Sequence, residues 1–148
     1  MADDIQPTAP QVKPEIQKPQ SETKVATILI VEDDPVLLKM YSEKFTFEGF
    51  SVLNARDGEE ALRVATTQKA NIILLDIMLP RMSGTDLLEK LKSDSKDEVH
   101  EIPVVVLTNL AEEEERQRAL KLGIKEYLVK AMQTPEQVVA TIKKHLKS

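Results

Sequence analysis

The sequence contains no cysteine and no long hydrophobic run. Without cysteine, the chain cannot form disulfides, use a thiolate nucleophile or bind a metal through cysteine. Its longest uninterrupted apolar runs are four residues, at 28–31, 72–75 and 104–107, whereas a membrane-spanning helix needs about 20. The first ten residues, MADDIQPTAP, lack the basic and apolar regions of a signal peptide. These absences predict a cytoplasmic protein with no membrane insertion.

Positive charge is also scarce relative to negative charge. The chain has 20 Lys and Arg against 25 Asp and Glu, which makes the formal net charge −5. Because the basic residues form no stripe, we expect no direct binding of nucleic acid. The length of 148 residues suits about one domain. The content of 41% hydrophobic and 30% charged residues is ordinary for a globular protein.

The composition of the chain changes near residue 25. Four of the eight prolines lie in the first 20 residues, among Gln, Lys and Glu. The few aliphatic side chains there follow neither a helical nor a strand period. Such a segment cannot bury enough apolar surface to offset its conformational entropy. We therefore expect residues 1–25 to be disordered, as a tether, a docking peptide or a solubilising tail, and residues 26–148 to form one domain.

Short aliphatic runs alternate with amphipathic stretches in the rest of the chain. The runs predict five strands, at 27–31, 51–55, 71–75, 104–107 and 125–129. Capping signals predict five helices, which begin at or just after Asp34, Asp57, Ser83, Glu112 and Thr134. Strands that alternate with helices in this way are typical of a parallel sheet covered on both faces. The sequence therefore predicts an α/β fold.

Apolar side chains recur at helical spacing in the first and last predicted helices. In the first, Leu37, Tyr41 and Phe45 recur at a spacing of four and are expected to face the core. The last begins with the capping-box pattern Thr-Pro-Glu-Gln. Its expected core residues are Val138, Ile142 and Leu146.

Polar side chains follow the predicted strands at their carboxyl ends, where ligands bind in an open α/β sheet. They are Glu32, Asp33 and Asp34 after the first strand, Asp76 after the third, Thr108 after the fourth and Lys130 after the fifth. Asp34 precedes a proline and is expected to cap a helix rather than to bind a ligand. Each of the others has an ordinary structural explanation when it is taken alone. Their combination indicates a functional site.

The acids of the first and third strands would meet if these strands are neighbours, which a doubly wound sheet permits. Crowded like charges are costly unless a proton or a cation neutralises them. Mg²⁺ fits best, because it uses one or two carboxylates and keeps several waters. The ammonium of Lys130 and the hydroxyl of Thr108 would complete a set of groups that can transfer a phosphoryl group to an aspartate.

The sequence resembles the receiver domains of response regulators in two-component signalling, over residues 26–148. The matching stretches are ILIVEDDP (28–35), LLDIMLPRMSG (74–84), IPVVVLT (102–108) and GIKEYLVK (123–130). The resemblance implies a doubly wound, flavodoxin-like (βα)5 fold. Its five-stranded parallel sheet would have the order 2-1-3-4-5.

The resemblance also implies a role for each residue of the site. Asp76 would be the phosphoacceptor. Asp33, Asp76 and the backbone carbonyl of Met78 would hold Mg²⁺, with Glu32 acting through water. Lys130 would contact the phosphoryl group. The implied phosphodonor is a histidine kinase, a phosphotransfer protein or a small phosphodonor.

Thr108 and Tyr127 would form the switch pair of such a domain. Phosphoryl oxygens would attract the Thr108 hydroxyl, and Tyr127 could then turn into the vacated space. This change would remodel the face made by the fourth helix, the fifth strand and the fifth helix. We expect an unidentified downstream protein to dock there, and the chain to be a monomer or a weak dimer through the same face.

Three features depart from the family pattern. Ala131 follows Lys130, where the family usually has a proline with a cis peptide bond. Because a cis bond without proline costs about 3 kcal/mol, we expect a trans bond there, and we expect the ammonium of Lys130 to lie near Asp76. Asn109 stands where alanine is common, and is expected to narrow access to the phosphoryl group. No output domain is expected.

Three other functions could use a similar fold. A phosphatase with an aspartyl nucleophile normally needs an acid two residues further on, and Met78 occupies that position. A nucleotide-binding module needs a glycine-rich first turn, whereas residues 32–35 are Glu-Asp-Asp-Pro and repel phosphate when no metal is present. An interaction module that works without phosphorylation would have the same sequence signals, and this alternative stays open.

Overall fold

A computed structural model describes residues 26–95 and 97–146. The segment 1–25, for which disorder was predicted, lies outside these residues. One parallel sheet contains β1 (Thr27–Val31), β2 (Ser51–Ala55), β3 (Ile72–Leu75), β4 (Val104–Thr108) and β5 (Glu126–Val129). Its strand order is β2-β1-β3-β4-β5. The predicted doubly wound topology is therefore confirmed.

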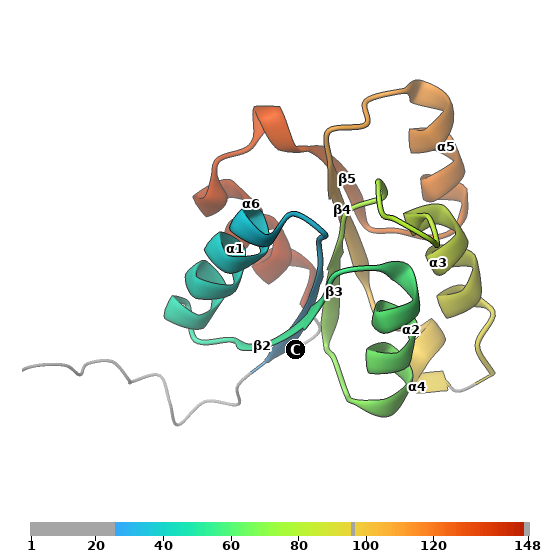
Figure 1. Cartoon of the computed structure of the whole chain (residues 1–148), viewed down its shortest axis with the longest axis horizontal. Helices are drawn as coiled ribbons and strands as arrows, with labels where there is room; N and C mark the ends of the chain where they lie inside the picture. The colour runs from blue at the N-terminus through green and yellow to red at the C-terminus, as the bar shows by residue number, and fades with distance from the viewer. Residues whose placement is uncertain (1–25, 96, 147–148) are drawn as a thin grey trace, which may run out of the picture.

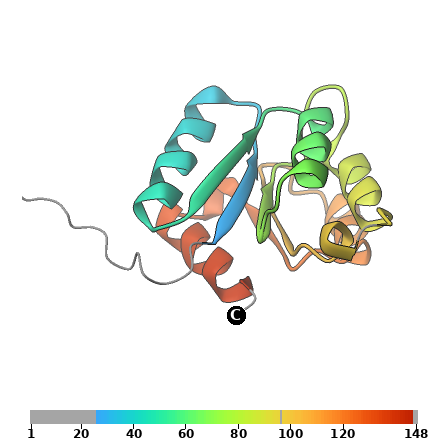
Figure 2. The same cartoon turned by 90° about the horizontal axis from the view of Figure 1, so that it is seen from below.

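Helices cover both faces of the sheet (Figure 1). One face carries α1 (Pro35–Phe47) and α6 (Pro135–His145), and the other carries α2 (Gly58–Thr67), α3 (Gly84–Lys92) and α5 (Glu113–Lys121). Figure 2 shows the two helical layers with the strands between them. A short helix that was not predicted, α4 (Asp97–His100), precedes β4. The fourth and fifth predicted helices are therefore α5 and α6.

The helices begin where the capping residues predict. Four helices have a side-chain cap, which accepts hydrogen bonds from backbone N–H groups of the first turn. The caps of α1, α2, α3 and α6 are, in this order, Asp34, Asp57, Ser83 and Thr134. Thr134 forms the predicted capping box with Gln137. Glu112 makes no such bond to α5, whose first turn contains three glutamates that interact favourably with the helix dipole.

Two hydrophobic cores lie on the two sides of the sheet. Successive side chains of a strand point to opposite faces. Leu29 and Val31 of β1 accordingly pack in the core with α2, α3 and α5, and Ile28 and Ile30 pack in the core with α1 and α6. All four residues of β3 are buried, as expected for a central strand covered on both faces.

The predicted core was wrong at one residue, Leu37, and only partly right at another, Leu146. Leu37 is only half-buried, and its neighbour Leu38 lies in the core instead. Leu38 lies three residues before Tyr41, and this spacing keeps both on one face of α1. Leu146 follows the end of α6, so it is half-buried, and it packs against the core with α1 and α6 rather than inside it.

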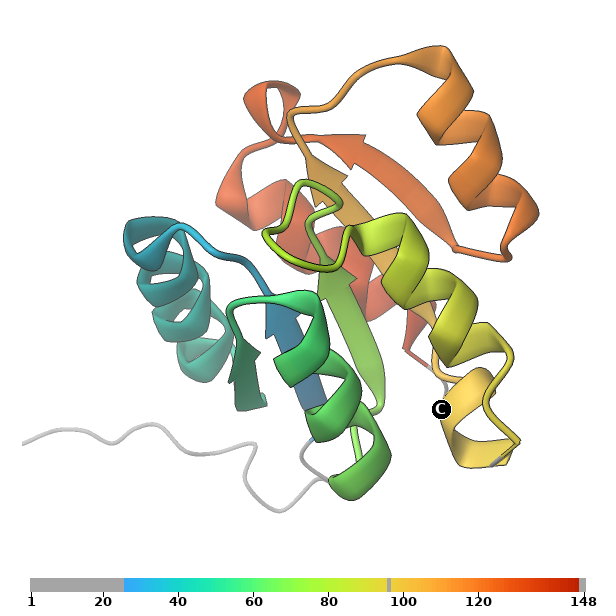
Figure 3. The same cartoon turned by 45° about the vertical axis from the view of Figure 1, so that its right-hand side comes forward.

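The carboxyl ends of the strands lie at one edge of the sheet, at the arrowheads in Figure 3. There α3 begins directly against the backbone that follows β3. A Cβ atom on Gly84 would lie 2.4 Å from the Cα of Ile77, so this close approach requires glycine. None of the helices within the described ranges combines the length and apolar character that a membrane crossing needs.

Candidate functional site

Three carboxylates gather at the carboxyl ends of β1 and β3. These strands are neighbours, with Val31 paired to Leu75, so the residues that follow them come together. One carboxylate oxygen from each of Glu32, Asp33 and Asp76 lies within 4.8 Å of the others. Glu32 and Asp76 are buried, whereas Asp33 is exposed. The predicted meeting of these acids is therefore confirmed.

Lys130 reaches into this acid cluster from the end of β5, where it begins a 3₁₀ turn, η3 (Lys130–Met132). Its Nζ lies 2.7 Å from Oε1 of Glu32 and 2.8 Å from Oδ2 of Asp76. Burial lowers the pKa of Lys130, but the two carboxylates outweigh it, so the pKa is raised. The ammonium is therefore charged at neutral pH. The bond to Ala131 is trans, as expected.

The carboxylates also accept backbone hydrogen bonds. Oε2 of Glu32 accepts one from the N–H of Asp34 at 3.1 Å, and Oδ1 of Asp76 accepts one from the N–H of Met78 at 3.0 Å. Burial is the largest cause of the raised pKa of Glu32, and the charge of Asp76 adds to it against the effect of Lys130. The side chain of Asp34 turns to the first turn of α1 and caps it, as predicted.

The acid cluster suits a hard divalent cation. It offers several carboxylate oxygens close together, and one ammonium balances only part of their charge. The backbone of Met78 lies beside it, since its N–H contacts Asp76. An octahedral Mg²⁺ ion, which takes a few protein oxygens and keeps waters, fits this donor set. The exposed Asp33 leaves the cluster open to solvent on one side.

Thr108 and Tyr127 are joined through the backbone of Leu110. Thr108 ends β4 and is fully buried, and its Oγ1 accepts a hydrogen bond from the N–H of Leu110 at 3.2 Å. The hydroxyl of Tyr127 donates to the carbonyl of Leu110 at 2.6 Å. Sequence reasoning missed Leu110, because its part is played by backbone atoms that any residue could supply. The effect of the exposed Asn109 on access to the site stays a prediction.

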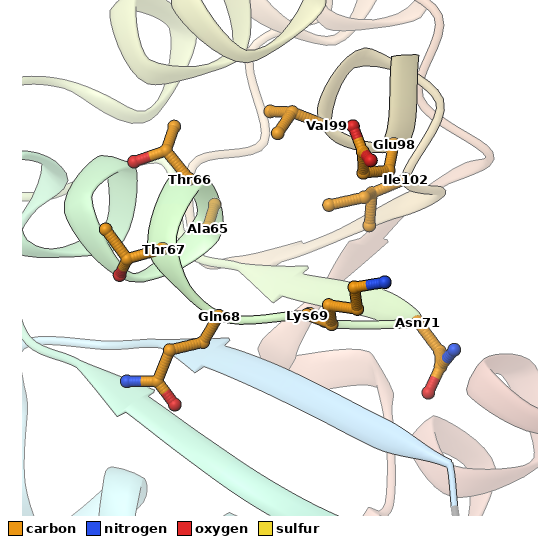
Figure 4. A pocket seen from close by; sticks show the side chains of 10 residues that line it. Ala65, Thr66, Thr67, Gln68, Lys69, Asn71, Glu98, Val99 and Ile102 are labelled. Carbon is orange, nitrogen blue, oxygen red and sulfur yellow. The ribbon is translucent and has the colours of Figure 1, made fainter. Parts of the chain in front are cut away.

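A separate cavity of about 480 Å³ lies away from these residues, between the end of α2, the start of β3 and α4 (Figure 4). Val99 and Ile102 are buried parts of its lining, and Lys69 and Glu98 are exposed parts. It lies at the amino end of β3, opposite the edge that carries the acids. None of the predicted site residues lines this cavity.

The sheet order, the acid cluster with its lysine and the buried threonine together define a class of signalling domain. A family model described as the response regulator receiver domain matches residues 28–143. The chain belongs to this family. Receiver domains accept phosphoryl groups in two-component signalling, bind Mg²⁺ at an acidic pocket and interact with histidine kinases or phosphotransfer proteins.

Individual relatives agree with this assignment. The probable transcriptional regulatory protein TcrX of Mycobacterium tuberculosis is 35% identical over 81% of this chain and 50% of its own length. The polar-differentiation response regulator DivK of Brucella anthropi is 32% identical over 81% of this chain and 95% of its own length. The chain thus spans about half the length of TcrX and of several other curated relatives.

Solved structures agree as well. Chemotaxis protein CheY4 of Vibrio cholerae superimposes with a TM-score of 0.76 at 27% identity, covering 83% of this chain and all of that one. The receiver domain of the sensor histidine kinase PA1611 of Pseudomonas aeruginosa has a TM-score of 0.73 at 26% identity, covering 82% of this chain and 97% of that one. That structure contains a magnesium ion coordinated in its active site cleft.

Proposed function

We propose that this chain is a response regulator that accepts a phosphoryl group on Asp76. The donor is a phosphohistidine of a histidine kinase or phosphotransfer protein, or a small phosphodonor. The observation that carries the proposal is the position of Asp76. Asp76 follows the central strand β3 and is buried, and its carboxylate has Lys130 at 2.8 Å and two further acids beside it.

The reaction is a transfer between two nucleophiles. An oxygen of Asp76 attacks phosphorus in line and forms an O–P bond, while the P–N bond to the donor imidazole breaks and its electron pair stays on that nitrogen. The N–H of Met78 and the ammonium of Lys130 orient the attacking carboxylate. Lys130 then stabilises negative charge on the transferred group. Water later attacks the acyl phosphate and returns the carboxylate and inorganic phosphate.

The residues that would hold Mg²⁺ are Asp33, Asp76 and the backbone carbonyl of Met78, with Glu32 acting through water. The bound ion supplies positive charge next to the phosphoryl oxygens. Three carboxylates against one ammonium leave the cluster with excess negative charge, which repels an incoming phosphoryl group. The carboxylates of Glu32 and Asp33 therefore serve to recruit the cation that makes the site attractive to phosphate.

The output of phosphorylation passes through Thr108, Leu110 and Tyr127. In the structure the Thr108 hydroxyl accepts a hydrogen bond from the N–H of Leu110. A phosphoryl group on Asp76 attracts this hydroxyl away from Leu110. Movement of Leu110 is transmitted to Tyr127, whose hydroxyl holds the Leu110 carbonyl. The face formed by α5, β5 and α6 then changes shape. Ala119 is the one buried residue of α5, so few buried contacts hold this helix in place. A downstream protein, or a second copy in a weak dimer, docks on this face.

Beryllofluoride binding and incorporation from acetyl phosphate test this proposal. Wild type should bind beryllofluoride and incorporate acid-labile phosphate, in both cases only with Mg²⁺. Asp76→Asn should fold and do neither, because it lacks the nucleophilic carboxylate. Equal incorporation in this variant and wild type would show that Asp76 is not the acceptor. If wild type neither binds beryllofluoride nor incorporates phosphate from acetyl phosphate, the result would favour an interaction module that works without phosphorylation.

A further inference from the structure

An ion pair ties the loop that follows Asp76 to the start of α2. Nη2 of Arg81, in the loop of residues 77–83, lies 2.8 Å from Oδ2 of Asp57. The side chain of Asp57 is 14% exposed, and its other oxygen accepts a hydrogen bond from the N–H of Glu60 at 2.8 Å. The carboxylate that receives Arg81 is thus already held in place by the first turn of α2.

The backbone of Arg81 is in a conformation that side-chain-bearing residues rarely adopt. Its φ is 67°, and within residues 26–95 and 97–146 no other residue except glycine has a positive φ. A left-handed residue of this kind persists only where its surroundings enforce it. Around it the loop is tightly closed, since the N–H of Met82 donates to Pro80 at 2.7 Å and that of Gly84 donates to Ile77 at 2.8 Å.

The next residue of the loop touches α2 directly. A Cβ atom on Gly58 would lie 2.7 Å from both the Cβ and the carbonyl oxygen of Met82. Two consecutive loop residues, Arg81 and Met82, therefore contact two consecutive residues at the start of α2, Asp57 and Gly58. The contact at Met82 fixes how close the loop lies, and the ion pair at Arg81 resists its withdrawal.

This ion pair borders the acid cluster. A recess of about 370 Å³ is lined by Asp33 of the acid cluster and by both members of the ion pair, Asp57 and Arg81. Its other lining residues are Arg56, Glu60 and Pro80. The other end of the loop begins beside Asp76, where the N–H of Met78 holds the Asp76 carboxylate. The loop therefore connects the ion pair at one end to the acid cluster at the other.

We infer that Arg81 and Asp57 are positioning residues for the metal site. Their ion pair holds the 77–83 loop so that the backbone of Met78 stays against the acid cluster, and it thereby increases the affinity of the cluster for Mg²⁺. This inference rests on the proposed function, because it takes the acid cluster to be the metal site. An ion pair in which Arg81 is 65% exposed contributes little to global stability. Its effect is to order the loop before the ion binds.

Two variants remove the ion pair by different routes. Arg81→Gly removes the guanidinium and also suits the left-handed backbone. Asp57→Ser keeps a hydroxyl that can cap α2 but cannot form the ion pair. Arg81→Lys retains the positive charge. The matched control is Arg63→Ala, which removes an exposed arginine of α2 that lies 3.9 Å from Glu60.

The dissociation constant for Mg²⁺ is measured by an NMR titration, and hydrogen exchange of the 77–83 amides is measured in the metal-free protein. Arg81→Gly and Asp57→Ser should each weaken Mg²⁺ binding about tenfold, because ordering of the loop then opposes binding of the ion, and should speed exchange in the loop. The double variant should be no weaker than either single one. The dissociation constant of Arg81→Lys should lie between those of the two single variants and that of wild type. The dissociation constant of Arg63→Ala should equal that of wild type.

The melting temperature separates positioning from a purely structural role. Arg81→Gly should weaken Mg²⁺ binding without lowering the melting temperature. If the ion pair were purely structural, Arg81→Gly would lower the melting temperature and leave the dissociation constant for Mg²⁺ unchanged. Unchanged dissociation constants in Arg81→Gly and Asp57→Ser would overturn the inference and leave the proposed function standing. Failure of wild type itself to bind Mg²⁺ would overturn the proposed metal site, and the inference with it. If Arg81→Gly does not fold, Asp57→Ser and Arg81→Lys decide the matter.

Discussion

Replacing Lys130 with methionine removes the ammonium that touches both buried carboxylates of the site while it keeps most of the side chain's volume. In the structure this ammonium lies 2.7 Å from Glu32 and 2.8 Å from Asp76. The variant leaves two buried carboxylates without that cation. We expect Lys130→Met to be less stable than wild type at neutral pH when Mg²⁺ is absent.

The expected size of the effect follows from burial. The exposed fractions of the side chains are 12% for Lys130, 6% for Glu32 and 7% for Asp76. Removing one partner of a buried ion pair costs about 3–5 kcal/mol. The lower end applies here, because Glu32 can take up a proton. A loss of about 3 kcal/mol corresponds to about 10 °C in melting temperature for a domain of this size.

The loss should depend on pH. Burial raises the pKa of Glu32 above its ordinary value of 4.5 even with Lys130 present, and removal of Lys130 raises it further. A carboxyl whose pKa is higher in the folded than in the unfolded state stabilises the fold below its unfolded pKa, and this stabilisation is lost as pH rises through the folded pKa. The deficit of Lys130→Met should therefore be largest above that raised pKa and should shrink as pH falls toward 4.5.

Urea denaturation, monitored by circular dichroism, measures the difference in free energy of unfolding between Lys130→Met and wild type. It is carried out at pH 7.5 and pH 5.5, with and without Mg²⁺. Added Mg²⁺ should stabilise the variant more than wild type, because it supplies the missing positive charge. The control is Lys39→Met, which removes a lysine 2.8 Å from Glu43 where both side chains are largely exposed, and it should leave stability unchanged. A deficit that is equal at both pH values and insensitive to Mg²⁺ would refute this reasoning.

Two further predictions concern other parts of the chain. Asp33→Ala should greatly weaken Mg²⁺ binding in a calorimetric titration. Asp34→Ala should largely keep the metal affinity but lower the free energy of unfolding by about 1 kcal/mol, because the α1 cap is lost. The reverse pattern would mean that the wrong acids have been assigned. Deletion of residues 1–24 should leave the melting temperature and the phosphorylation rate nearly unchanged. The composition of this segment predicts no part in a core, and β1 is already paired on both sides by β2 and β3. A drop of many degrees would show that the segment packs on the domain.

Much of the fold could be read from local signals. A helix start depends on side chains within one turn, so Asp34 before Pro35 and Thr134 before Gln137 marked the starts of α1 and α6 correctly. Short aliphatic runs likewise marked all five strands to within a residue at each end. The four-residue α4 is too short to show a helical period. Adjacent Leu37 and Leu38 are chemically equivalent, so packing alone chose which of them faces the core.

The sequence by itself determined which chemical groups stand at the carboxyl ends of the strands, because strand and helix signals are local and a parallel sheet brings those ends to one edge. It thereby predicted that Glu32, Asp76 and Lys130 would meet. Only the tertiary structure decided how they meet, with the Lys130 ammonium shared between two carboxylates. Tertiary structure alone also placed Arg81 on Asp57, 24 residues earlier in the chain. Contacts of this kind depend on the path of the backbone between distant residues, which residue type and spacing do not encode.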